Sequence, residues 1–169
     1  MEYIWSAHPL FAVEQGDHIV LPDSVNEVVV EGSAQNRLGK QGTTLMWPKA
    51  TPENQKLSDL TVTGKVTDGI GDKLFAASPL EGWCGIERKR LNCRIELYFD
   101  PKRLPYLGLW ICYGGWPEHK ANRQQCVALE PCTALGDSLA AAVSQGRARR
   151  LGPEAKDHWS LELRVGGVL

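Results

Sequence analysis

Glu130 is the acidic residue whose position is most suggestive of chemistry. It follows the apolar run Cys126–Leu129 and precedes Pro131, at the point where a buried strand is expected to end. Holding a carboxylate there is costly unless hydrogen bonds or a positive charge compensate it. The position indicates either a functional carboxylate or a glutamate that ties down the following loop.

Three further residues are candidates for the same site. His8 follows the first predicted strand, where it can act as a proton donor or as a hydrogen-bonded structural histidine. Asp72 opens the predicted strand Lys73–Ala77, where a turn-capping aspartate is the common explanation. Trp116 lies in a Gly-Gly-Trp-Pro turn and can either stack on the apolar face of a sugar or pack within its loop.

Other chemistries lack sequence support. There is no nucleophile elbow, phosphate-binding loop or dinucleotide-binding glycine pattern, and the four histidines are not spaced as local metal ligands. The basic cluster Arg147–Arg150 follows a predicted helix, which favours a solvated surface over an anion site. We therefore expect neither a metal nor a nucleotide cofactor.

Composition narrows the class of partner. The 169 residues are 43% hydrophobic and 23% charged, as in ordinary globular proteins. Because 19 basic residues are matched by 20 acidic ones, the net charge of -1 argues against nucleic acid and favours a neutral ligand. Five cysteines without a C-x-x-C pair indicate reduced thiols. No basic-then-apolar leader and no membrane-length apolar run is seen, so we expect a cytoplasmic protein without membrane contact.

Period-2 alternation predicts that strands position these residues. The predicted strands are Tyr3–Ser6, His18–Leu21, Glu27–Glu31, Leu60–Gly64, Lys73–Ala77, Trp83–Arg88, Asn92–Phe99, Tyr106–Tyr113, Gln125–Leu129 and Trp159–Val165. Many short strands separated by turn residues are typical of an antiparallel sandwich.

Four segments of this pattern carry more specific expectations. Neither face of Tyr106–Tyr113 is plainly polar, so this strand should be central. In the last strand, Trp159–Val165, the apolar side chains are expected to point inward. The one predicted helix, Leu139–Gln145, ends at a glycine, and Gly32–Lys56 is expected to be a long surface loop.

Three segments together resemble the aldose 1-epimerase family, whose fold is galactose mutarotase-like. In Ile4–Phe11 a histidine precedes an aromatic-containing turn. Leu104–Trp110, followed by Tyr113–Pro117, is similar to a strand of the bacterial members. The most specific segment is Val127–Pro131 with Asp137–Leu139 downstream, which resembles the glutamate-bearing strand and the acidic turn after it.

The resemblance implies a mainly β fold, namely an antiparallel β-sandwich that is part of a galactose mutarotase-like supersandwich, with one short helix. It makes Glu130 the catalytic base, His8 the general acid and Asp72 a substrate-binding residue. Trp116 is the residue that we expect to stack on the sugar. Interconverting anomers requires a proton taken from the C1 hydroxyl and another given to the ring oxygen, which a carboxylate and an imidazolium on opposite sides of the sugar can do.

Members of that family are about twice as long, and their sites also include an arginine and a second histidine from an N-terminal half. The resemblance covers their C-terminal half, so we expect residues 1–169 to form one domain that lacks the other half. Uncovered strand edges would favour a homodimer or a partner chain supplying that half. We expect an aldose 1-epimerase-like isomerase acting on a monosaccharide, the alternative being a carbohydrate-binding module with little or no turnover.

Overall fold

The computed structural model describes residues 1–51, 57–118 and 121–167. Its strands are β1 (Glu2–Tyr3), β2 (Leu10–Ala12), β3 (His18–Val20), β4 (Glu27–Ser33), β5 (Thr44–Met46), β6 (Lys49–Ala50), β7 (Ser58–Asp59), β8 (Ile70–Ala77), β9 (Trp83–Arg88), β10 (Cys93–Phe99), β11 (Tyr106–Tyr113), β12 (Gln125–Cys132), β13 (Arg149–Arg150) and β14 (Leu161–Gly167). The helical elements are the 3-10 turns Ala34–Asn36 and Val66–Asp68 and the α-helix α1 (Leu139–Ser144).

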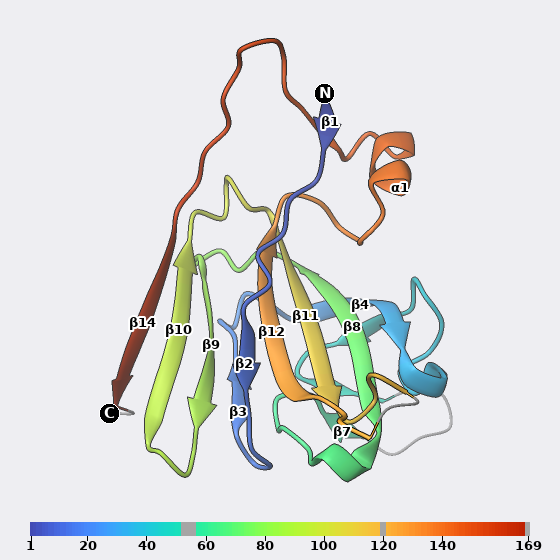
Figure 1. Ribbon diagram of the computed structural model, residues 1–169, viewed down its shortest axis with the longest axis vertical. Helices are drawn as coiled ribbons and strands as arrows, with labels where there is room; N and C mark the ends of the chain where they lie inside the picture. The colour runs from blue at the N-terminus through green and yellow to red at the C-terminus, as the bar shows by residue number, and fades with distance from the viewer. Residues whose placement is uncertain (52–56, 119–120, 168–169) are drawn as a thin grey trace.

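The strands form two main antiparallel sheets. One sheet has six strands in the order β2-β12-β11-β8-β4-β5, and the other has four in the order β14-β10-β9-β3. Two small sheets pair β1 with β13 and β6 with β7. Figure 1 shows β14 at the outer edge of the molecule, reached by a long connection from α1 that passes over the end of the sheets. The fold is an antiparallel β-sandwich with one short α-helix among the described residues, as predicted.

The core lies between the two sheets. Leu109 and Leu129 from the six-stranded sheet and Ile86 and Leu97 from the four-stranded sheet belong to one cluster of buried apolar side chains. Because alternate residues of a strand point to opposite faces, the other face of each sheet is free to carry polar groups. Strand β11 lies between β12 and β8, which confirms the central position predicted for Tyr106–Tyr113.

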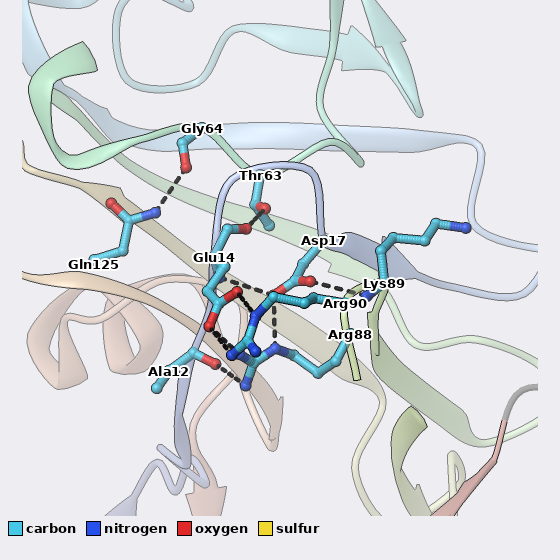
Figure 2. Close-up of polar contacts among 9 residues, drawn as sticks. All are labelled: Ala12, Glu14, Asp17, Thr63, Gly64, Arg88, Lys89, Arg90 and Gln125. Carbon is cyan, nitrogen blue, oxygen red and sulfur yellow. Dashed lines mark hydrogen bonds and ion pairs between the residues drawn. The ribbon is translucent and has the colours of Figure 1, made fainter. Parts of the chain in front are cut away.

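A network of polar side chains joins the turn between β2 and β3 to the end of β9 (Figure 2). The buried carboxylate of Asp17 faces Arg88 Nε at 2.6 Å and accepts from the Lys89 amide at 3.0 Å. Arg90 donates two hydrogen bonds of 2.7 Å to Glu14. The partners of both carboxylates come from the last residue of β9 and the turn that follows it. This network therefore holds the β2–β3 turn against the second sheet and is structural.

The helix forms as the sequence indicates, one residue shorter at its end than predicted. Ser138 Oγ accepts a hydrogen bond of 3.2 Å from the Ala141 amide, so it acts as the N-cap. Gly146, just after the helix, has φ of 65°, the left-handed conformation that glycine adopts most readily. Within the described ranges, no helix has the length and apolar character needed to cross a bilayer.

Several sequence-based expectations about elements are corrected. Of the predicted strand Tyr3–Ser6, only Tyr3 lies in a strand, β1, and Ser6 makes an isolated bridge with Cys132. The segment Gly32–Lys56, expected to be a loop, contains the strands β5 and β6, while residues 52–56 lie outside the described residues. Leu60–Gly64 is not a strand: Val62 makes only an isolated bridge with His18, because the chain has already turned after β7. Leu161, Leu163 and Val165 lie on the core side of their sheet, as expected, opposite Phe99, Leu97 and Ile95. They are not buried there, however, and are 36%, 57% and 67% exposed, because the six-stranded sheet does not cover β14.

Candidate active site on the six-stranded sheet

Glu130 lies on the face of the six-stranded sheet that points away from the core. In strand β12 it alternates with Leu129, which is fully buried in the core. Glu130 is directly opposite Gly108 on β11, and a Cβ added at Gly108 would lie 3.1 Å from Glu130 Oε2. The missing side chain at Gly108 therefore makes the space that the carboxylate occupies.

The N-terminal segment runs along the end of β12 and brings His8 to Glu130. The amide of Trp5 donates to Thr133 Oγ1 at 2.7 Å, and the amide of Ala7 donates to the Pro131 carbonyl at 3.1 Å. His8 Nδ1 consequently lies 3.1 Å from Glu130 Oε1. The structure thus brings together the two residues predicted to act as base and acid.

Lys73 is the residue of this site that the sequence did not reveal. Its ammonium forms an ion pair with Glu130 Oε2 and lies 3.7 Å from Asp137 Oδ1. Ser6 Oγ is a weaker partner of the same carboxylate oxygen, at 3.4 Å. Lys73 follows Asp72 in strand β8, so the two side chains point to opposite faces of the sheet. The contact between Lys73 and Glu130 depends on the register of β8 against β11 and of β11 against β12, which the sequence does not specify.

The carboxylate is almost completely removed from water. Glu130 is 3% exposed and the Lys73 side chain 13%, whereas His8 is 57% exposed. Oε2 is occupied by Lys73, while Oε1 is buried and makes no hydrogen bond of good geometry among the described residues. Oε1 therefore keeps capacity to accept a hydrogen bond, and the exposed imidazole of His8 lies 3.1 Å from it.

An aromatic hollow adjoins His8. It has a volume of about 380 Å³ and is lined by His8, Leu10, Trp110, Trp116 and Gln124. Trp116 is 53% exposed, and Trp110 lies on the same face of the sheet as Glu130. Indole faces beside a polar edge suit the apolar face of a sugar ring, so Trp116 is placed where the predicted stacking could occur.

Asp72 lies elsewhere. It is fully buried on the core-facing side of β8, where it pairs with Arg37 and accepts a hydrogen bond of 2.6 Å from Ser33 Oγ. Asp72 and Lys73 are consecutive in one strand and so point to opposite faces. The structure therefore does not bring Asp72 together with Glu130, His8 and Trp116, and its observed partners give it a structural task.

The electrostatics around Glu130 extend to a neighbouring thiol. Burial, and next the charge of Glu130, raise the pKa of Cys132 to about 12, so this thiol stays protonated. Among the described residues no group of three or more histidine, cysteine, aspartate or glutamate side chains is arranged to hold a metal ion. What the site offers is a desolvated carboxylate, an exposed imidazole and an ammonium beside an aromatic hollow.

His8 and Glu130, the residues predicted to act as acid and base, are in contact in this structure. An imidazolium and a carboxylate that act from opposite sides of a sugar ring need a gap between them that a pyranose can enter, and 3.1 Å leaves no such gap. His8 would have to turn outward to admit a ring. Its 57% exposure means that little packing opposes this movement.

Comparison with known proteins supports the fold. No protein-family model and no curated protein sequence matches the chain. A solved structure, that of the Slr1438 protein from Synechocystis sp. PCC 6803, matches with a TM-score of 0.65 and 16% sequence identity. The match covers 99% of this chain and 46% of Slr1438, so the chain spans about half the length of that protein. This likeness shows a shared fold.

Proposed function

We propose that this chain is an aldose 1-epimerase-like isomerase that interconverts the anomers of a monosaccharide. The observation that carries the proposal is the buried oxygen Oε1 of Glu130, which lacks a good hydrogen-bond donor and faces His8 at the edge of an aromatic hollow. A carboxylate with a free acceptor position can take the proton of the C1 hydroxyl. His8, turned outward, can give a proton to the ring oxygen.

Lys73 has a supporting role in this scheme. Its ammonium contacts Oε2 and compensates the charge of a carboxylate that is removed from water, which leaves Oε1 for the substrate. Trp110 and Trp116 would hold the ring against the mouth of the site by stacking. After ring opening, rotation about the bond to C1 and closure on either face require only that the two protons be returned.

A second candidate function is a carbohydrate-binding module with little or no turnover. The specific observation in its favour is that Lys73 and His8 already contact the two oxygens of Glu130. If the contact between His8 and Oε1 persists when sugar binds, the C1 hydroxyl cannot reach this oxygen. The hollow beside them would then be a binding surface only.

Anomer exchange measured by NMR on α-D-glucose and α-D-galactose separates the two candidates. We expect catalysed exchange, reduced by about 10²–10⁴-fold in Glu130→Gln and in His8→Asn. Glu96→Gln, on the outer face of the other sheet, is the matched control and should exchange at the wild-type rate. Saturation-transfer signals from bound sugar without exchange would favour the binding module. If the wild type shows no binding and no catalysed exchange, both functions are refuted for these sugars.

A further inference from the structure

Strand β14 presents an open edge of the four-stranded sheet. It pairs with β10 through seven consecutive residue pairs without a bulge, and no described strand pairs with its other edge. Its sequence, Leu-Glu-Leu-Arg-Val-Gly-Gly, contains neither proline nor lysine. Natural edge strands are usually protected by charged residues or proline, by bulges or by a covering segment. Among the described residues β14 has neither a bulge nor a covering segment, and its two charged residues, Glu162 and Arg164, have opposite signs.

The apolar side of this edge is also uncovered. Leu161, Leu163 and Val165 lie on the same side of the sheet as Phe99, Leu97 and Ile95, their respective partners on β10. Leu97 and Phe99 are buried in the core, yet all seven residues of β14 are exposed. The core side of the sandwich therefore continues onto β14 as an apolar row in contact with solvent, which is typical of an interface.

The opposite side of β14 is charged in a self-complementary way. Glu162 and Arg164 alternate with the apolar residues and contact each other, with Arg164 Nε 2.8 Å from Glu162 Oε1. In an antiparallel pair, residues directly opposite each other share a face, and opposite charges placed there are favourable. A strand with one acid and one base placed symmetrically about Leu163 matches a copy of itself.

We propose that two copies of the chain associate through β14, antiparallel across a two-fold axis at Leu163, so that the two four-stranded sheets join into one sheet of eight strands. In this register Leu163 faces Leu163 of the second copy, and Leu161 faces Val165. Glu162 of each copy faces Arg164 of the other. The interface is isologous, as a two-fold axis requires, and it joins the two uncovered apolar rows.

Neighbouring registers are unfavourable. A shift by one residue in each copy centres the axis on Arg164 or on Glu162 and places like charges directly opposite each other. If the axis instead passes between two neighbouring residues, such as Leu163 and Arg164, apolar residues lie opposite charged ones. The two apolar rows would then lie on opposite sides of the joined sheet. The register centred on Leu163 is the one that satisfies both patterns.

Sedimentation velocity at micromolar concentration tests the association. We expect the wild type to sediment with twice the mass of the 18.7 kDa chain. Leu163→Lys sets two ammonium groups opposite each other and should weaken association at least about ten-fold. Leu80→Lys is the matched control, because Leu80 is 83% exposed and lies outside β14, and it should remain dimeric. Far-UV circular dichroism of both variants checks that the fold is retained.

Charge exchange and cross-linking test the register. Arg164→Glu should dissociate the dimer, and the double variant Glu162→Arg with Arg164→Glu should restore it. Under mild oxidation with diamide, Leu163→Cys should form a disulfide-linked dimer at a rate well above that of the wild type. Val165→Cys should not, because it faces Leu161 of the second copy rather than itself. A wild type that stays monomeric, or a dimer that survives both Leu163→Lys and Arg164→Glu, would overturn the proposal.

Discussion

Replacing Glu130 by glutamine should destabilise the protein by about 2–4 kcal/mol, because it removes one member of a desolvated ion pair. The Glu130 and Lys73 side chains are 3% and 13% exposed. Removing one partner of a buried pair typically costs about 3–5 kcal/mol, since the remaining charge stays buried. Here Lys73 keeps Asp137 at 3.7 Å, but that carboxylate is 57% exposed, and an exposed partner contributes about 0–1 kcal/mol.

A double-mutant cycle isolates the contribution of the pair. Lys73→Met should cost a similar amount, because Glu130 keeps only Ser6 at 3.4 Å and His8 at 3.1 Å. Glu130→Gln combined with Lys73→Met leaves no uncompensated charge in the site. We expect the double variant to lose at least about 2 kcal/mol less than the sum of the two single variants.

Urea unfolding followed by tryptophan fluorescence gives the free energy of unfolding of each variant. Equal m-values, the slopes of this free energy against urea concentration, check that the variants expose the same surface on unfolding. Asp137→Asn is the control and should cost less than about 1 kcal/mol. Additive effects in the cycle, or a cost below about 0.5 kcal/mol for Glu130→Gln, would show that water reaches the pair and would refute the description of Glu130 as a desolvated carboxylate. This result would stand whether or not the chain turns over a sugar.

Two further predictions concern the same sheet. Gly108→Ala would place a methyl group 3.1 Å from both Glu130 Oε2 and Phe75 Cε1, so we expect the free energy of unfolding in urea to fall by about 1–3 kcal/mol. Gly32→Ala is the control and should lower it much less, because no atom lies within 4 Å of the new methyl group. A hydrogen bond with the opposite thiol, Cys126, is the main cause that lowers the pKa of Cys112 to about 7. Because the folded pKa lies below the ordinary value, ionisation of Cys112 stabilises the fold above about pH 9, and this contribution is lost as the pH falls through about 7. The unfolding midpoint in urea should therefore rise from pH 7 to 9, and Cys126→Ala should flatten the rise; the same slope in that variant would contradict the assignment.

The sequence was sufficient to predict those strands whose bounds follow from alternation and turn residues within the segment itself. Strands β10 and β11 begin and end within a residue of their predicted bounds, because alternation and flanking turns define each segment by itself. Leu163 lies on the core side of its sheet, as predicted, yet it is 57% exposed. Alternation shows that a strand has an apolar face but not whether another layer covers it, and coverage depends on how far the opposite sheet extends.

The candidate site was predictable in part for the same reason. Glu130 stood out because a carboxylate at the end of an apolar run needs compensation, and the structure supplies it. The compensating residue, Lys73, could not be identified, because the register of β8 against β11 and of β11 against β12 brings it there. Asp72 was also a candidate from sequence, although a turn-capping role was the common explanation for it. Its place in the alternation of β8 puts its side chain on the core side of the sheet.

The two ion pairs on β8 show why a ligand would bind on the outer face. Asp72 with Arg37 and Lys73 with Glu130 are built from consecutive residues, but on opposite sides of the sheet. Each oxygen of Asp72 has a partner, Ser33 or Arg37, and the residue is fully buried, so a ligand in solvent cannot reach this pair. Glu130 retains one under-satisfied oxygen beside an exposed imidazole. Since β14 belongs to the other sheet, pairing of two copies there leaves the outer face of the six-stranded sheet uncovered, and the site and the interface can be tested independently.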